Sequence, residues 1–218
     1  MIRSPCILVA LIPLLGMAAE PAPAPPTPAV RAPEAALVGD VRLLLARAPG
    51  LGTIRGAAVD DDGDSGVLIS PEIVLRHQVL GRFGYIVGVG LFASAHSISD
   101  DLTDGTFTYY AAGAQASAGV TFRIKPGWHA ELRALGQVGR GALVFSPEDN
   151  DDDDSRGAVG HYRALGGLGG LAYTLVNGLE LAGHVGWQDI EGRSEFAGTM
   201  TTSEGRGLVT GVSLGYVF

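Results

Sequence analysis

The sequence predicts an all-β fold, an eight-stranded antiparallel up-and-down transmembrane β-barrel. Hydrophobic and polar residues alternate with a period of two in successive segments, as in strands that have two different faces. Long acidic loops alternate with short turns between these segments, and the last segment, EGRGLVTGVSLGYVF (204–218), has one apolar face and one face of small residues. The 33 glycines disfavour helices, so the chain is suited to a sheet rather than to a helix bundle.

The N-terminal residues 1–19 have the pattern of a signal peptide. Arg3 supplies the positive charge, 7–15 the apolar core and 16–19 the small residues of a cleavage zone. The apolar core is too short for a membrane helix, which needs about 20 apolar residues. Cys6, the only cysteine, would be removed with this segment, which excludes disulfides, cysteine–zinc sites and cysteine nucleophiles from the mature chain.

Residues 20–36 form a Pro/Ala-rich stretch in which alternating Pro and Ala favour an extended spacer. We expect a periplasmic leader here, either without a contact or as a tether to peptidoglycan or a partner. The barrel domain is expected over 37–218. Its first part, Leu37–Ala48, fits an amphipathic helix or the start of a long first strand with Asp40 and Arg42 facing inward.

Eight strands are expected in the barrel domain, separated in turn by long loops and short turns. The strands are predicted at 51–59, 67–79, 83–96, 106–125, 128–145, 157–176, 179–191 and 204–218. The loops are predicted at 60–66, 97–105, 146–156 and 192–203, and the turns at 80–82, 125–127 and 177–178. Most aromatic residues fall near strand ends, as in the girdles at the two surfaces of a bilayer. Because barrels of the outer membrane have short periplasmic turns and longer extracellular loops, both termini are expected in the periplasm.

Charged residues recur on one face of several strands, opposite an apolar face. In 67–79, Glu72 and Arg76 oppose the apolar face, and in 128–145 Glu131 and Arg133 do the same. A shift of the register by one residue would place an arginine in lipid at a cost of about 2–4 kcal/mol. We therefore predict that the charges face the lumen and form a polar network. Its predicted members are Glu72, Arg76, Glu131, Arg133, Arg163 and Glu180.

The terminal strand resembles the closing strand of bacterial outer-membrane β-barrels. In that family the final Phe and the aromatic residue two positions before it form part of a signal for the barrel-assembly machinery, which implies this role for Tyr216 and Phe218. Over about 51–218 the chain resembles small OmpA/OmpX-like barrels. This resemblance implies fold and location, an integral outer-membrane protein of a Gram-negative cell envelope, more directly than it implies a function.

Some small barrels of this kind are enzymes that act on lipid A. One of them uses a His and a Ser two residues apart, plus an acid, on the lipid-facing wall. Here His96 and Ser97 are adjacent, and His184 and Ser213 are distant in the sequence. His129, His161 and His184 are expected at different heights of the lumen and are not expected to form a triad or a metal site, so no catalytic residue is predicted.

The first acidic loop contains Asp60, Asp62 and Asp64, which have the alternating spacing of a calcium loop. Ser65 and Pro71 occupy positions where an EF-hand needs Gly and Glu, so the EF-hand pattern is incomplete. Ca²⁺ or Mg²⁺ could still bridge such loops to lipopolysaccharide phosphates.

The sequence favours a non-enzymatic barrel with acidic extracellular loops and an envelope-stabilising or surface-interaction role. The alternatives are a narrow porin-like channel and a lipid A-modifying enzyme. The expected partners are outer-membrane lipid and lipopolysaccharide, with the barrel-assembly machinery during biogenesis. No nucleic-acid partner is expected, and the protein is expected to be a monomer.

Overall fold

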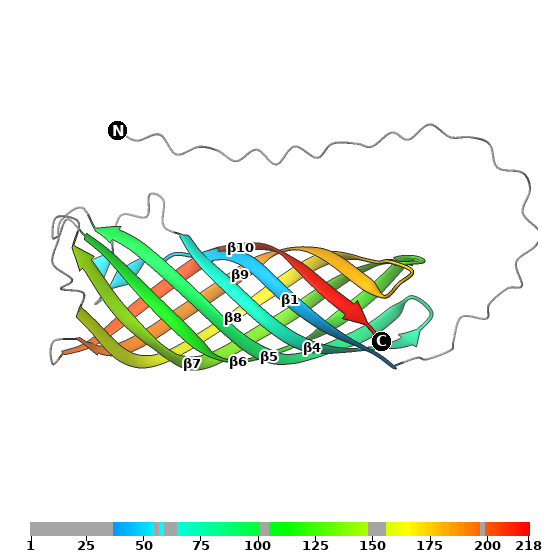
Figure 1. The fold of residues 1–218 in the computed structure, drawn as a ribbon, viewed down its shortest axis with the longest axis horizontal. Coiled ribbons are helices and arrows are strands. Elements are labelled where there is room, and N and C mark those ends of the chain that lie inside the picture. The colour runs from blue at the N-terminus through cyan, green and yellow to red at the C-terminus, as the bar shows by residue number, and fades with distance from the viewer. Residues whose placement is uncertain (1–36, 55–56, 59–64, 101–104, 148–155, 197–198) are drawn as a thin grey trace, which may run out of the picture. The chain divides into compact units, whose positions relative to one another are not determined.

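The computed structural model consists of one antiparallel sheet that closes on itself (Figure 1). It describes residues 37–54, 57–58, 65–100, 105–147, 156–196 and 199–218. The predicted signal peptide and leader, residues 1–36, lie outside the described residues, as does most of the predicted loops 60–66 and 146–156. Among the described residues, no helix is long and apolar enough to cross a membrane.

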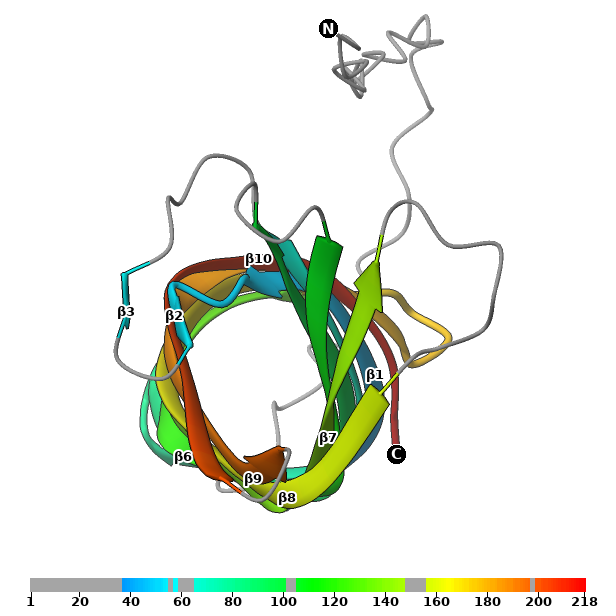
Figure 2. The same ribbon diagram turned by 90° about the vertical axis from the view of Figure 1, so that its left-hand side faces the viewer.

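Eight long strands form the wall of the barrel. They are β1 (Leu37–Pro49), β4 (Ser65–Leu80), β5 (Phe83–Asp100), β6 (Gly105–Lys125), β7 (Trp128–Pro147), β8 (Arg156–Thr174), β9 (Leu179–Phe196) and β10 (Thr199–Val217). Each pairs with the next along the chain, and β1 pairs with β10 from Asp40↔Val217 to Arg47↔Thr210. Figure 2 looks into the resulting ring. The predicted eight-stranded antiparallel up-and-down barrel is therefore confirmed.

The first barrel strand differs from the prediction. The predicted strand 51–59 is wrong: the described part of this segment holds only two short strands, β2 (Thr53–Ile54) and β3 (Ala57–Ala58), and β2 pairs with β10. The strand alternative for Leu37–Ala48 is confirmed, and the helix alternative is wrong. The reason is that β1 pairs with a neighbour on both of its edges, β4 and β10, which no helix could replace.

The three short turns carry the glycine conformations that such connections require. Gly81, Gly127 and Gly178 have φ angles of 55°, 76° and 87°, in the left-handed region that residues with a Cβ rarely adopt. These turns lie at the positions that the sequence predicted. They define one end of the barrel, here called the turn end, and the opposite end is called the loop end.

At the loop end the strands run further than predicted. The predicted loop 192–203 lies largely within β9 and β10, which pair as far as Phe196↔Thr199. The predicted loop 97–105 likewise begins inside β5, which pairs with β6 up to Asp100↔Gly105. A strand continues through polar residues as long as its backbone N–H and C=O groups pair with a neighbouring strand. A prediction from the alternation of hydrophobicity therefore makes these strands too short.

Side chains alternate between an outer and an inner face along every long strand. The outer face is apolar in its central band, with exposed residues such as Leu43, Val89, Leu132, Leu171 and Val212. The inner face holds buried side chains that fill the lumen. Eight strands enclose an interior just wide enough for such filling.

The C-terminus completes the closure at the turn end. The backbone N–H of Phe218 donates to the carbonyl of Gly39 at 2.9 Å, and a Cβ added to Gly39 would approach the Phe218 ring to 2.8 Å. Tyr216 and Phe218 both have exposed side chains on the outer face. Their role in assembly remains a prediction, since the geometry places them but does not test recognition.

Candidate functional site

The turn-side half of the lumen contains a cluster of ion pairs, here called the lumen network. Its residues are Asp40, Arg42, Glu72, Arg76, Glu131, Arg133 and Glu180, all buried except Arg76, which is 12% exposed. Arg42, which is 1% exposed, lies at its centre. The guanidinium of Arg42 lies 3.0 Å from Asp40, 2.9 Å from Glu131 and 2.9 Å from Glu180.

Two further arginines extend the network across the lumen. Arg76 from β4 lies 2.7 Å from Asp40 and 2.9 Å from Glu180. Arg133 from β7 lies 2.7 Å from Glu72 and 3.2 Å from Glu131. The network thereby joins β1, β4, β7 and β9, which are not all neighbours in the sheet, through the interior of the barrel.

Five of the six residues predicted for the polar network lie in it: Glu72, Arg76, Glu131, Arg133 and Glu180. The prediction is wrong for Arg163, whose side chain is 67% exposed on the outer face. Segment 157–176 is rich in glycine on both faces, so its sequence does not show which face is inward. Asp40 and Arg42 were not predicted as members, although the strand alternative for Leu37–Ala48 places both inward.

The lumen histidines adjoin this network. Arg76 Nη1 donates to His129 Nε2 at 2.6 Å. His184 Nε2 lies 2.8 Å from Ser213 Oγ, and His184 Nδ1 lies 3.6 Å from Glu131 Oε1. The sequence did not predict the contact between His184 and Ser213, which are distant along the chain. The distance from His184 Nδ1 to Glu131 is longer than a hydrogen bond, so these contacts do not contradict the expectation that the histidines form no triad. His161, expected in the lumen, is exposed on the outer face.

The order Ser213–His184–Glu131 is that of a nucleophile, a base and an orienting acid. The three residues are 4%, 6% and 5% exposed, however, and Glu131 also binds both Arg42 and Arg133. The hydrogen bond between His184 Nε2 and Ser213 Oγ gives two buried polar groups a partner, and buried polar groups are costly to leave unpaired.

A layer of glutamines lies next to the charged half. Gln137 Nε2 donates to Gln115 Oε1 at 2.9 Å, and Gln188 Nε2 donates to Gln137 Oε1 at 2.8 Å. Gln115 Nε2 lies 3.4 Å from Glu72 and so joins the layer to the lumen network. We call Gln115, Gln137 and Gln188 the glutamine layer.

The loop-side half of the lumen is apolar and aromatic, and we call it the apolar layer. Its largest buried members include Leu44, Leu68, Phe92, Tyr109, Tyr162 and Ile190. Two of its polar side chains have backbone partners: the Tyr109 hydroxyl donates to the carbonyl of His161 at 2.9 Å, and His96 Nδ1 lies 2.8 Å from the carbonyl of Pro49.

Leu51 closes the apolar layer at the loop end. It is 2% exposed and packs in the same hydrophobic cluster. Its N–H donates to the carbonyl of Ser97 at 3.4 Å, and the N–H of Gly52 donates to the carbonyl of Glu204 at 2.8 Å. The segment after β1 therefore connects β5 to β10 above the ends of β1 and β4. Buried side chains of the described strands line the lumen from the lumen network to Leu51.

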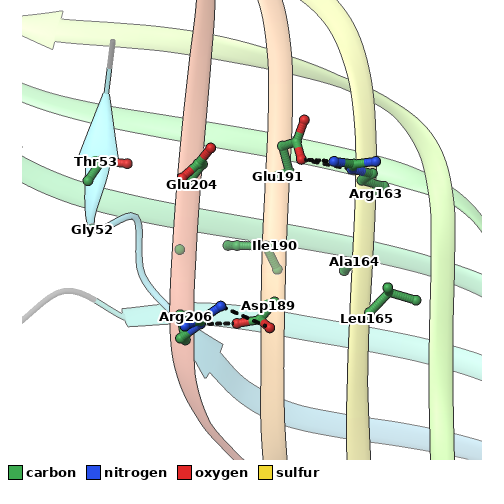
Figure 3. Close-up of a pocket in the computed structure, with 11 residues that line it drawn as sticks. Gly52, Thr53, Arg163, Ala164, Leu165, Asp189, Ile190, Glu191, Glu204 and Arg206 are labelled. Atoms are coloured by element: carbon green, nitrogen blue, oxygen red, sulfur yellow. Dashed lines mark hydrogen bonds and ion pairs between the residues drawn. The ribbon is translucent and has the colours of Figure 1, made fainter. Parts of the chain in front are cut away.

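The outer wall has a cavity with charged side chains at the loop end of β8, β9 and β10 (Figure 3). This rim cavity measures about 690 Å³ and is lined by charged side chains of both signs with Gly52, Thr53 and Leu165. Arg163 Nε donates to Glu191 at 2.8 Å, Arg193 Nε donates to the same carboxylate at 2.6 Å, and Arg206 pairs with Asp189. Figure 3 shows the Arg163 and Arg206 pairs on neighbouring strands.

The predicted metal residues Asp60, Asp62 and Asp64 lie outside the described residues. Among the residues that are described, no group of three or more His, Cys, Asp or Glu could hold a metal ion. Calcium or magnesium binding therefore remains a prediction for the loops.

No protein-family model matches the chain, and no curated protein matches it. Among solved structures the chain is similar to Neisserial surface protein A (NspA), with 14% identity and a TM-score of 0.41, over 84% of this chain and 99% of that chain. It is also similar to Ail, the attachment invasion locus protein of Yersinia pestis, with 18% identity and a TM-score of 0.35, over 83% and 99% of the two chains. A further structure of Ail, in complex with the heparin analogue sucrose octasulfate, matches with 16% identity and a TM-score of 0.36, over 84% and 99%. The expected likeness to small OmpA/OmpX-like barrels is confirmed for the fold, by the closed ring of eight antiparallel strands.

Proposed function

We propose that this chain is a non-enzymatic integral β-barrel of the bacterial outer membrane with an envelope-stabilising or surface-interaction role. The observation that carries the proposal is the contrast between the two faces of the closed ring. Charged groups are buried in the lumen, whereas the outer face exposes Val, Leu and Ile side chains on every long strand. Water is a poor solvent for such a surface, and a bilayer is a good one.

The energetic difference between the two environments is large. Each Val, Leu or Ile side chain that leaves water contributes about 1.5–3 kcal/mol. More than twenty large apolar side chains are exposed on the barrel strands. Insertion into lipid is therefore favoured by tens of kcal/mol, on the order of the sum of these contributions.

The proposal includes an orientation and partners. The acidic loops lie outside the cell and the turns in the periplasm, to which a cleaved signal peptide directs the chain. Outer-membrane lipid and lipopolysaccharide surround the barrel, and Ca²⁺ or Mg²⁺ bridges loop carboxylates to lipopolysaccharide phosphates. Tyr216 and Phe218 are read by the barrel-assembly machinery, and the folded barrel is a monomer.

Cell fractionation combined with gel mobility tests the proposal. Expressed in a Gram-negative host, the protein is expected in the outer-membrane fraction, and its band should shift when the sample is boiled before electrophoresis. A protein that dissolves in the periplasm without detergent would contradict the proposal.

A narrow channel is the first alternative. The proposal of a closed lumen is supported by the contact of the lumen network with the glutamine layer and by the apolar layer with Leu51 above it. Purified protein in planar lipid bilayers is expected to give no steady conductance. The channel would be favoured by discrete, reproducible conductance steps that persist in a variant whose loop sequences are scrambled.

A lipid A-modifying enzyme is the second alternative, and the Ser213–His184–Glu131 contacts are the observation that favours it. Its test is mass spectrometry of lipid A from cells with and without expression, together with Ser213→Ala. We expect the same lipid A species in all three samples. A modified species that depends on Ser213 would establish the enzyme.

A further inference from the structure

We infer that the outer wall over β8, β9 and β10 binds a phosphorylated glycolipid of the outer leaflet, with its head group in the rim cavity and an acyl chain in an apolar groove below it. The inference rests on the proposed outer-membrane location. Two hollows on the same three strands support it. One is lined by charged side chains and the other mainly by apolar residues, and Trp187 lies between them.

The upper hollow is the rim cavity. Arg163 and Arg206 each direct Nε and Nη2 at a carboxylate, and among the described contacts Nη1 of each guanidinium stays available as a donor. Because a guanidinium matches the oxygens of a phosphate, these Nη1 groups suit a phosphate in the cavity. Both side chains are mostly exposed, so a ligand reaches them without unfolding the wall.

The carboxylates of the cavity point to a sugar rather than to a simple anion. Glu204, Asp189 and Glu191 line the same space as the arginines, so the cavity carries both signs of charge. A bare anion offers these carboxylates no hydrogen-bond donor, whereas a phosphorylated sugar also carries hydroxyls that donate hydrogen bonds to them. The volume of about 690 Å³ is within the range of small-molecule sites and exceeds what one phosphate needs.

The lower hollow, here called the glycine groove, lies six residues further toward the turn end on each strand. It measures about 670 Å³ and is lined mainly by apolar residues, among them Gly169, Leu171, Gly183, Val185 and Val212. A Cβ added to Gly183 would meet nothing within 4 Å, which shows that the missing side chain leaves open space on the wall. An acyl chain fits such a groove, because it is apolar and lies in the exposed apolar band.

Trp187 connects the two hollows. It pairs with Gly167 on β8 and with Leu208 on β10, between the rows that line the rim cavity and those that line the groove. Its ring is half exposed, as expected for an indole at the boundary between head groups and acyl chains. Six residues of strand span about 20 Å, which is comparable to the length of an acyl chain below its head group.

The test uses the folded full-length chain in detergent micelles, with Trp128→Phe so that Trp187 fluorescence reports binding. Bisphosphorylated lipid A is titrated and compared with lipid A whose phosphates are removed and with phosphatidylglycerol, which has a phosphate but no sugar. We expect saturable binding of bisphosphorylated lipid A that is at least tenfold tighter than that of either comparison lipid.

Two variants and their matched controls locate the site. The double variant Arg163→Ala/Arg206→Ala should weaken binding at least tenfold, and Arg82→Ala/Arg123→Ala, exposed at the turn end, should leave it unchanged. Gly183→Leu should weaken it severalfold by filling the groove, and Ala118→Leu, exposed on β6, should not.

The outcomes separate this inference from the proposed function. Two results, in barrels that still show the boiling-dependent gel shift, would overturn the glycolipid site and leave the membrane barrel intact. One is that phosphatidylglycerol binds as tightly as bisphosphorylated lipid A. The other is that the site variants change binding no more than their controls do. Protein that neither inserts nor shows the shift would overturn both.

Discussion

The two halves of the lumen use opposite means to fill the same cylinder. The turn-side half holds the lumen network, in which three arginines face four carboxylates. The loop-side half holds the apolar layer, which depends on volume rather than on specific pairs. The glutamine layer separates them. The comparison teaches that one half specifies which strands lie opposite each other, whereas the other half excludes water.

The two halves differ because apolar contacts and buried ion pairs respond differently when a partner side chain is changed or displaced. An apolar core accepts other side chains of similar volume. A buried charge must meet its partner, because an unpaired one is strongly destabilising. Arg42 on the first strand binds carboxylates on β7 and β9, so strand pairing with a wrong register would leave these groups unpaired. We therefore expect the network to fix the register of barrel closure.

Removal of Arg42 should have the largest effect. Arg42→Ala leaves Asp40, Glu131 and Glu180 without their central partner and should lower the free energy of unfolding by about 3–5 kcal/mol. Urea unfolding of the barrel in liposomes measures this loss. The matched control is Arg47→Ala on the exposed face of the same strand, with an expected change within about 0.5 kcal/mol. Equal losses for the two variants would show that the network does not hold the barrel together.

Truncation in the apolar layer should have the next largest effect. Leu68→Ala removes a side chain that is 1% exposed and should cost about 2–5 kcal/mol, because the surroundings collapse only in part. Leu68→Met keeps the volume and should cost less than about 1.5 kcal/mol. If the methionine variant were as unstable as the alanine variant in the same unfolding assay, this half would depend on shape as strictly as the charged half.

The boundary between the halves is tested by Gln137→Leu. The leucine leaves the amides of Gln115 and Gln188 without the central glutamine, so we expect a loss of about 1–3 kcal/mol. Gln137→Glu keeps the acceptor for Gln188 and removes the donor to Gln115. If Gln137→Leu were as stable as the unmodified barrel, the hydrogen bonds of the glutamine layer would not contribute to stability, and the layer would behave like the apolar half.

The smallest effect is expected at Ser213. Ser213→Ala removes one hydrogen bond to His184 and should cost about 0.5–1.5 kcal/mol. Ser213→Thr keeps the hydroxyl and serves as the control in the same denaturant titration. A loss above about 3 kcal/mol would place His184 and Ser213 among the essential parts of the charged half.

The sequence predicted the wall of the barrel better than its interior. Strand faces and turns follow from alternation and from glycine, as at Gly81 and Gly178, and both are local properties. Arg163 was misplaced because the glycines of β8 give neither face a clear character. The first strand was misplaced because 51–59 alternates as well as 37–49 does, and only the pairing of β1 with both β4 and β10 decides between them.

Contacts across the lumen could not be predicted from alternation. Which inward residues meet depends on the stagger of the strands around the ring, a property of the closed barrel. His184 and Ser213 meet because β9 and β10 are adjacent, whereas Glu131 reaches His184 from β7, across the lumen side of β8. The charges therefore showed which residues face inward but not which of them form pairs.

The most direct test of the membrane barrel is a nitroxide scan of β10 in lipid vesicles. Single cysteines at successive positions from Leu208 to Ser213, in a chain without Cys6, carry the spin label. We predict that oxygen, which dissolves in lipid, relaxes the labels at 208, 210 and 212, whereas labels at 209, 211 and 213 are protected from oxygen and from a water-soluble nickel complex. Relaxation by the nickel complex on the even-numbered face, or the absence of alternation, would contradict the account.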